Sequence, residues 1–132
     1  MNKILHIMTG TSPYNIKFIR FLKSYFDNGK HKIVVFGRND GSYDSDITFI
    51  NKKKQVFELR KLMKNSDKII IHGLFSPHLV LLLYSFSPRL LKKSYWVIWG
   101  GDLYYYKFRN KSFKSNIYEF MRGKVIKNIG HI

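Results

Sequence analysis

Short apolar runs that alternate with helix-like stretches constrain the fold of this chain more than any other feature. Each run has the length of a buried strand, and most are followed by glycine or polar residues and then by apolar residues at helical spacing. The runs that we predict to be strands are Lys3–Met8, His31–Phe36, Ile47–Ile50, Lys68–Ile71 and Tyr95–Trp99. Short apolar strands separated by helices favour an α/β fold, with a parallel sheet, right-handed crossovers and helices on both faces.

Caps and apolar spacing indicate the helices between these strands. We expect Asn15 to cap the first helix and Ser76 to cap the helix that follows the fourth strand. In that later helix the run Leu79–Leu83 is apolar nearly all round, which predicts that it is well buried. The tail from Lys111 predicts a final helix, and Val125–Ile129 predicts a further strand after it.

Length and composition predict a single folded domain over residues 1–132. The chain is 45% hydrophobic, which is enough to bury a core, and two independent domains of half this length would be hard to stabilise. It contains no cysteine, which excludes disulfides, thiolate metal sites and cysteine nucleophiles. Its five histidines show no ligand spacing such as HxxxH, so we expect no metal ion and no other cofactor.

The net charge of +16, from 24 Lys and Arg against 8 Asp and Glu, first indicates a nucleic acid or an anionic membrane as partner. The excess is spread along the chain and comes mostly from lysine, whereas specific phosphate and base recognition tends to use arginine. A lysine-rich composition that only makes a solvated surface, with no anionic partner, would give the same even spread of positive charge. Between the two partners the pattern favours an anionic leaflet, to which each nearby Lys or Arg contributes about 1 kcal/mol, over a specific nucleic acid.

No stretch of the sequence is typical of a membrane span or of a signal peptide. The most apolar region, residues 69–86, is interrupted by two histidines, a glycine and a proline, whereas a spanning helix needs about 20 mostly apolar residues. The first residues lack the long apolar block and the small-residue cleavage site of a secretory signal. We therefore expect the chain to stay on the side of the membrane where it is made.

Candidate binding residues follow the predicted strands, because ligands of open parallel sheets bind beyond the C-terminal ends of the strands. The sequence has no GxGxxG, GxxxxGKS/T or GxSxG motif, so neither a dinucleotide, a P-loop nucleotide nor a serine nucleophile is indicated. His72 ends the fourth strand, and Gly73 beside it permits a positive φ or a close approach to a ligand. The imidazole of His72 could donate to a sugar hydroxyl or a phosphate, or it could merely close the strand.

The string WVIWGGDLY, at residues 96–104, is the densest in unusual residues. Its two adjacent glycines leave bare backbone N–H groups that can hold an anion. Asp102 could accept a proton from a hydroxyl nucleophile or bind sugar hydroxyls, and Trp99 and Tyr104 have the flat amphipathic faces that carbohydrates use. In the alternative interpretation, Asp102 caps a helix and the aromatic residues pack in the core. His6, which lies inside the first strand, would by itself be a core histidine.

The string HGLFSP at residues 72–77 and the string WVIWGGDLY together resemble a known family. They are similar to the bacterial TDP-N-acetylfucosamine:lipid II N-acetylfucosaminyltransferases of enterobacterial common antigen synthesis, which form glycosyltransferase family 56. Further matches are the opening strand with His6, Asn15 with Phe18 and Phe21, and Asn39-Asp40-Gly41 followed by Ser45. The resemblance extends over essentially all of residues 1–130, and the two strings are much more specific together than either is alone.

This resemblance implies a fold, an activity and a location. The fold is a Rossmann-like domain of a GT-B glycosyltransferase, and the reaction moves a deoxyamino sugar from a dTDP donor to an undecaprenyl-diphosphate-linked oligosaccharide without a metal ion. Members are peripheral proteins of the cytoplasmic face of the inner membrane. Within the resemblance, the catalytic residues are Asp102 and His72, and the substrate-binding residues are His6, Gly73, Phe75, Trp99, Gly100, Gly101 and Tyr104.

The resemblance also implies a second half. Chains of this family continue through a C-terminal domain that holds most of the nucleotide sugar, whereas the N-terminal domain mainly contacts the acceptor. We therefore expect this chain to act as an acceptor-side fragment, a truncated reading frame or half of a split enzyme, and to have no transferase activity alone. The competing hypotheses are a basic, non-catalytic binding module for RNA or anionic membrane, motivated by the charge of +16 and the interleaved aromatic residues, and a gene remnant that does not fold stably.

Overall fold

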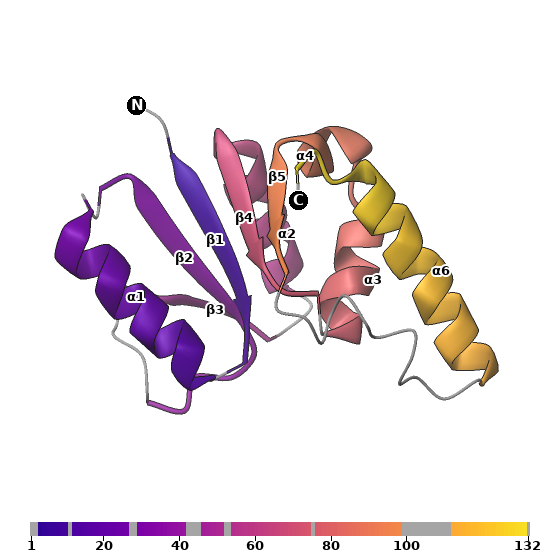
Figure 1. Cartoon of the computed structure of the whole chain (residues 1–132), viewed down its shortest axis with the longest axis horizontal. Helices are drawn as coiled ribbons and strands as arrows, with labels where there is room; N and C mark the ends of the chain where they lie inside the picture. The colour runs from indigo at the N-terminus through magenta and orange to yellow at the C-terminus, as the bar shows by residue number, and fades with distance from the viewer. Residues whose placement is uncertain are drawn as a thin grey trace. The chain divides into compact units, whose positions relative to one another are not determined.

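The chain forms one five-stranded sheet with helices, the α/β arrangement that the alternating pattern predicts. A computed structural model describes residues 3–10, 12–26, 29–41, 46–51, 54–74, 76–98 and 112–131. The strands are β1 Ile4–Thr9, β2 His31–Phe36, β3 Thr48–Ile50, β4 Lys68–His72 and β5 Ser94–Val97. All are parallel, in the order β3-β2-β1-β4-β5, so the predicted parallel, Rossmann-like sheet is confirmed (Figure 1).

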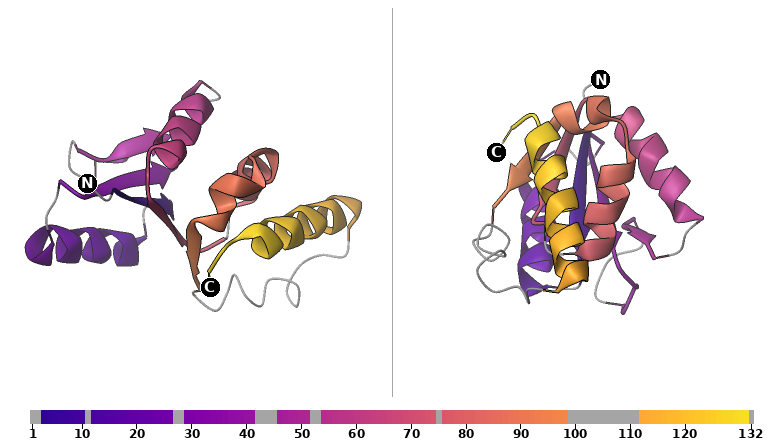
Figure 2. Two further views of the ribbon diagram at one scale, coloured as in Figure 1. Left: turned by 90° about the horizontal axis from the view of Figure 1, so that it is seen from above. Right: turned by 90° about the vertical axis from the view of Figure 1, so that its right-hand side faces the viewer.

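The chain divides into two compact units, residues 1–70 and 71–132, and β4 contributes residues to both. In the first unit β1 pairs with β2 from Ile4 opposite His31 to Thr9 opposite Phe36. Helix α1, Pro13–Tyr25, and helix α2, Gln55–Lys64, lie on opposite faces of these strands (Figure 2).

The core beneath α1 explains why this first unit folds as it does. It is built from alternate residues of the strands and from one face of the helix: Met8, Ile19, Leu22, Ile33, Val35 and Ile47, with Phe18 and Phe49 packed against them. Because side chains alternate along a strand and recur every three to four residues on a helix, these spacings bring all of them to one interface.

The second unit is mainly helical. It contains α3, Pro77–Ser85, α4, Pro88–Lys92, and α6, Phe113–Asn128, and α3 and α6 pack side by side (Figure 1). After α6 the chain runs along β5, where the His131 carbonyl accepts from Trp96 N at 2.9 Å and His131 N donates to the Ser94 carbonyl at 3.1 Å. The rings of Tyr95 and His131 stack with centroids 4.3 Å apart. These contacts fix the C-terminal end of the described chain against β5.

Two helix starts test the predicted caps. Ser76 caps α3, as predicted, and its Oγ accepts from Leu79 N at 3.3 Å. The prediction that Asn15 caps α1 is wrong, because the helix begins at Pro13 and Ser12 is its cap. Proline has a fixed φ and no N–H, so it is well suited to the first helical turn and moves the cap one residue upstream of itself.

Three further differences separate the structure from the sequence pattern. Val125–Ile129 forms no strand, because α6 continues through Asn128, and the buried Arg122 and Val125 lie one helical turn apart. Leu79–Leu83 is not buried all round, since Leu81 is 55% exposed. The short helix α4 has no counterpart in the prediction. Among the described residues, no helix has the length and apolarity to cross a membrane.

Candidate functional site

In the first unit, two glycines join the C-terminal ends of three strands. Gly10 N donates to the Phe36 carbonyl at 3.1 Å, and Gly37 N donates to the Ile50 carbonyl at 3.0 Å. Both glycines have positive φ, and a Cβ on Gly37 would lie 3.7 Å from the Cα of Gly10. Side chains other than hydrogen are strained in this backbone conformation, so both positions favour glycine.

Asn15 holds the loop between β1 and α1. Its side chain is buried, and Nδ2 donates to the Thr9 carbonyl at 3.1 Å and lies 3.4 Å from the Gly10 carbonyl. Sequence spacing indicated a cap at this position, but the amide instead reaches back to the strand that precedes the helix. It therefore fixes the direction in which the chain leaves β1.

We expect Asn15→Ala to lower the free energy of unfolding by about 1–2 kcal/mol, because it leaves two strand-end carbonyls without this donor. Urea denaturation followed by circular dichroism measures the change. Ser24→Ala is the control, since the Ser24 hydroxyl is exposed and donates to the Arg20 carbonyl on the same helix, and its effect should stay within about 0.5 kcal/mol. Equal losses in the two variants would contradict the role given to Asn15.

His72 lies at the end of β4 and is only 6% exposed. Burial in a low-dielectric environment disfavours the charged imidazolium and lowers the pKa of His72 from 6.5 to about 4. The side chain is therefore neutral at pH 7 and offers one donor and one acceptor. Gly73, the next residue, is buried with φ +90°, a conformation that favours glycine.

The lowered pKa limits what His72 can do chemically. A general base works best when its pKa is near the working pH, and a group with a pKa of about 4 is a weak base at pH 7. A neutral imidazole at the strand end is better suited to a hydrogen bond with a hydroxyl or with an uncharged part of a ligand. Of the two residues that the sequence predicts to be catalytic, His72 is therefore poorly suited to abstract a proton.

His6 lies in the middle of β1, not at its end, and is buried. Its Nε2 is 2.8 Å from Nδ1 of His31, and the two rings stack with centroids 5.1 Å apart. The ring of Phe18 packs against His6 at 5.6 Å. These are the contacts of a core histidine, the alternative that the sequence left open, and they place His6 beneath α1 in the first unit.

The other predicted site residues lie outside the described residues. They are Phe75, Trp99, Gly100, Gly101, Asp102 and Tyr104. Their roles stay predictions from the sequence. Of the site predicted in the second unit, the described residues therefore include His72 and Gly73, at the end of β4. The neighbouring strand β5 ends at Val97, the second residue of the string WVIWGGDLY.

Sequence reasoning did not single out Arg122, the one charged side chain among the buried polar residues of the described chain. Its guanidinium carbon lies 5.6 Å from the centroid of the Trp96 ring, and Nη1 is 3.5 Å from Oε1 of Glu119. The glutamate three residues earlier on the same helix is the signal that could have indicated a pair. Arg122 therefore links α6 to β5 through its cation–π contact with Trp96, and its ion pair with Glu119 lies within α6.

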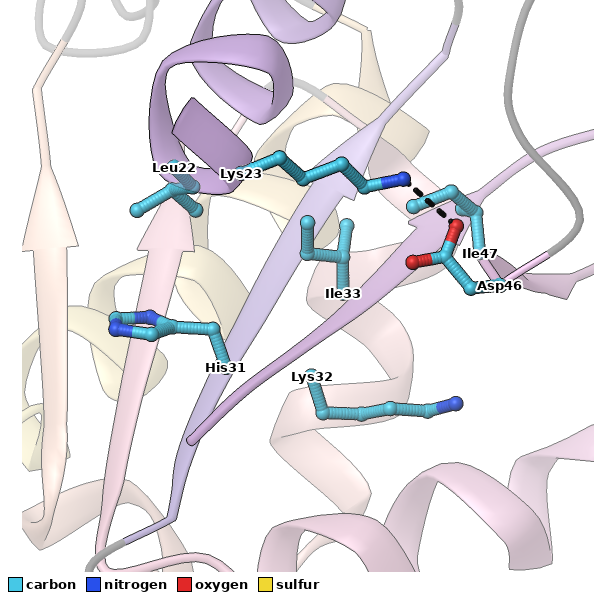
Figure 3. Close-up of a pocket in the computed structure, with 7 residues that line it drawn as sticks. All are labelled: Leu22, Lys23, His31, Lys32, Ile33, Asp46 and Ile47. Atoms are coloured by element: carbon cyan, nitrogen blue, oxygen red, sulfur yellow. Dashed lines mark hydrogen bonds and ion pairs between the residues drawn. The ribbon is translucent and has the colours of Figure 1, made fainter. Parts of the chain in front are cut away.

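Among the described residues, each unit contains a cavity. In the first, Lys23 Nζ and Asp46 Oδ1, 2.8 Å apart, cross a space of about 30 Å³ beside Ile33 (Figure 3). It holds about one or two water molecules and is too small for a sugar. The second, of about 250 Å³, lies in the second unit and is lined mainly by apolar side chains, with a lysine and an asparagine: Tyr84, Phe86, Pro88, Leu91, Lys124, Val125 and Asn128.

Within the part of the chain that the structure describes, no three His, Asp or Glu side chains are grouped so that they could hold a metal ion. Comparison with protein-family models, with curated proteins and with solved structures finds no match to this chain.

Proposed function

We propose that this chain is the acceptor-binding part of a glycosyltransferase that works as a peripheral protein at the cytoplasmic face of the inner membrane. The resemblance to glycosyltransferase family 56 implies that the donor is a dTDP-linked deoxyamino sugar, N-acetylfucosamine, and that the acceptor is an undecaprenyl-diphosphate-linked oligosaccharide. The observation that carries the proposal is the position of the two strings HGLFSP and WVIWGGDLY, which begin within the last two residues of β4 and β5 and continue beyond the ends of these strands. These strands are parallel neighbours, and the C-terminal ends of such strands form the ligand edge of an open sheet.

In this proposal Asp102 and His72 divide the chemistry. The Asp102 carboxylate takes the proton from the acceptor hydroxyl, and the hydroxyl oxygen bonds to the anomeric carbon of the donor sugar. At the same time the bond from that carbon to dTDP breaks, and dTDP leaves with the electron pair. His72 contributes a neutral hydrogen bond to the acceptor, which agrees with a pKa of about 4. Gly73, with its positive φ, lets the backbone approach the ligand.

Acceptor binding by the 132-residue chain tests the proposal. We expect saturable binding of the undecaprenyl-diphosphate-linked disaccharide in detergent micelles, measured by calorimetry, and much weaker binding of undecaprenyl phosphate, which carries no sugar. Asp102→Asn and His72→Gln should each raise Kd about tenfold, the usual effect of one lost hydrogen bond to a buried polar group. His78→Gln, an exposed histidine in the first turn of α3, is the control and should leave Kd unchanged.

Two results would overturn the proposal. One is equal affinity for the disaccharide-linked lipid and for undecaprenyl phosphate, because a sugar site must distinguish them. The other is an unchanged Kd in both strand-end variants. Tight and steeply salt-dependent binding of single-stranded RNA, with no preference among the lipids, would instead identify a basic nucleic-acid module, the function that the charge of +16 favours as the second candidate.

A further inference from the structure

Helix α1 carries a stripe of aromatic side chains of which only Phe18 packs against the core. The core takes Ile19 and Leu22 from this helix, whereas Tyr14, Phe21 and Tyr25 are exposed and Phe26 follows at its C-terminal end. We define the α1 aromatic stripe as Tyr14, Phe18, Phe21, Tyr25 and Phe26. Residues three and four apart are neighbours on a helix, so the first four members follow one line along it.

Four of the five rings of the stripe contact one another through Phe21 and form a continuous apolar surface. The centroid of Phe21 lies 6.4 Å from Phe18, 5.2 Å from Tyr25 and 5.7 Å from Phe26, and Phe26 in turn lies 5.8 Å from the His31 ring. The ring planes are inclined to each other by 39° to 65°. Tilted rings pack edge against face, so they form an apolar surface and not a row of parallel faces on which nucleic-acid bases stack.

Positive charge accompanies the stripe. Helix α1 contains Lys17, Arg20 and Lys23 and no acidic residue, and Lys30 and Lys32 follow at the start of β2. Lys23 is paired with Asp46, while Lys17 and Arg20 lie on exposed positions of the helix. With a net charge of +16, a second copy of the chain would be repelled from this surface, whereas an anionic bilayer would be attracted to it.

We propose that the α1 aromatic stripe, with Lys17 and Arg20, is a docking surface for an anionic phospholipid bilayer. The rings enter the boundary between headgroups and acyl chains, and the cations contact lipid phosphates. An amphipathic helix binds a membrane surface in this way, with affinity from both buried apolar area and charge. The inference goes beyond the proposed function because it assigns the lipid-binding surface and needs neither donor nor acceptor sugar.

Vesicles without any glycolipid test this inference separately from the transferase. The protein should sediment with phosphatidylcholine vesicles that contain 30% phosphatidylglycerol and remain largely in solution with phosphatidylcholine alone. The double variant Phe21→Ser/Tyr25→Ser should bind the anionic vesicles at least tenfold more weakly. Phe57→Ser is the matched control, because Phe57 on α2 is 74% exposed, close to the 76% of Tyr25, and should leave binding unchanged.

A second measurement uses the absence of cysteine from the chain. Tyr25→Cys and Phe57→Cys each create a single site for a polarity-sensitive fluorophore, and both positions are exposed, so the fold is retained. Anionic vesicles should shift the emission of the label at position 25 to shorter wavelength and leave that at 57 unchanged. Four results would each overturn the inference. They are equal shifts at both positions, no shift at position 25, a shift at position 25 with single-stranded RNA alone, and a dimer that depends on α1. Failure of acceptor binding would leave it intact.

Discussion

Gly130→Ala is expected to lower the free energy of unfolding by about 3 kcal/mol or more. A Cβ built on Gly130 would lie 1.8 Å from the carbonyl oxygen of Lys92 and 2.8 Å from its carbonyl carbon. Both are backbone atoms at the end of α4, so no side-chain rotation relieves the overlap, and overpacking that moves backbone is strongly destabilising. The shift would also disturb the bond from Gly130 N to the Leu91 carbonyl, at 3.1 Å, which leads the chain onto β5.

Gly123→Ala provides a control of opposite sign. Gly123 lies in the interior of α6, and a Cβ there would meet nothing within 4 Å. Alanine in an exposed helix interior is favoured over glycine by about 1 kcal/mol, so this variant should be more stable than the native chain. Chemical denaturation of both variants, followed by circular dichroism, gives the comparison. Native stability in Gly130→Ala would show that the chain after α6 does not pack against α4.

The parts of the fold that the sequence predicts well are those in which local signals agree with tertiary packing. The strand His31–Phe36 is predicted at its observed bounds, because a β-branched apolar run there is also a buried strand between two neighbours. Ser76 caps α3 because serine followed by proline satisfies both the cap and the first helical turn. When a short segment gives few signals, agreement between residue type and burial is the best indication that its predicted helix or strand is correct.

The sequence predictions are wrong where two local signals favour different structures for the same residues. Val125 and Ile129 favour a strand by residue type, but their spacing of four also suits a helix, and packing of α6 against α3 decides in favour of the helix. Asn15 is a favoured cap residue, yet proline two positions earlier starts the helix sooner. Both cases depend on contacts between segments that are distant in the sequence, which residue type alone does not contain.

In the candidate site, too, the sequence predicts the local features and does not predict those that depend on tertiary packing. The sequence correctly associates His72 with the end of a strand, because a histidine and a glycine that follow an apolar run are visible as a pattern. It could not show that the histidine is buried, or that burial makes it a neutral hydrogen-bonding group. Nor could it show that His6 pairs with His31, since this contact depends on the register in which β1 and β2 align.

Stability should fall with acid in a way that depends on His72. The unfolded chain carries an ordinary histidine, which takes up a proton as the pH falls below 6.5, whereas the folded chain does not protonate His72 until the pH approaches 4. Between these values the unfolded state binds more protons, so acid favours unfolding. The contribution of His72 is fully present above pH 6.5, and about 2 kcal/mol of it should be lost between pH 7 and pH 5.

His72→Gln isolates this contribution, because glutamine retains a hydrogen-bonding side chain and does not titrate. Urea denaturation of the native chain at pH 7 and pH 5 should show about 2 kcal/mol more loss than the same comparison made with His72→Gln. His78→Gln, which removes an exposed histidine from the same unit, is the control variant. If His72→Gln had the same pH dependence of stability as the native chain, the imidazole of His72 would protonate in the folded chain as readily as in water. Burial would then not be what keeps His72 neutral, and the neutral hydrogen bond proposed for it would lose its support.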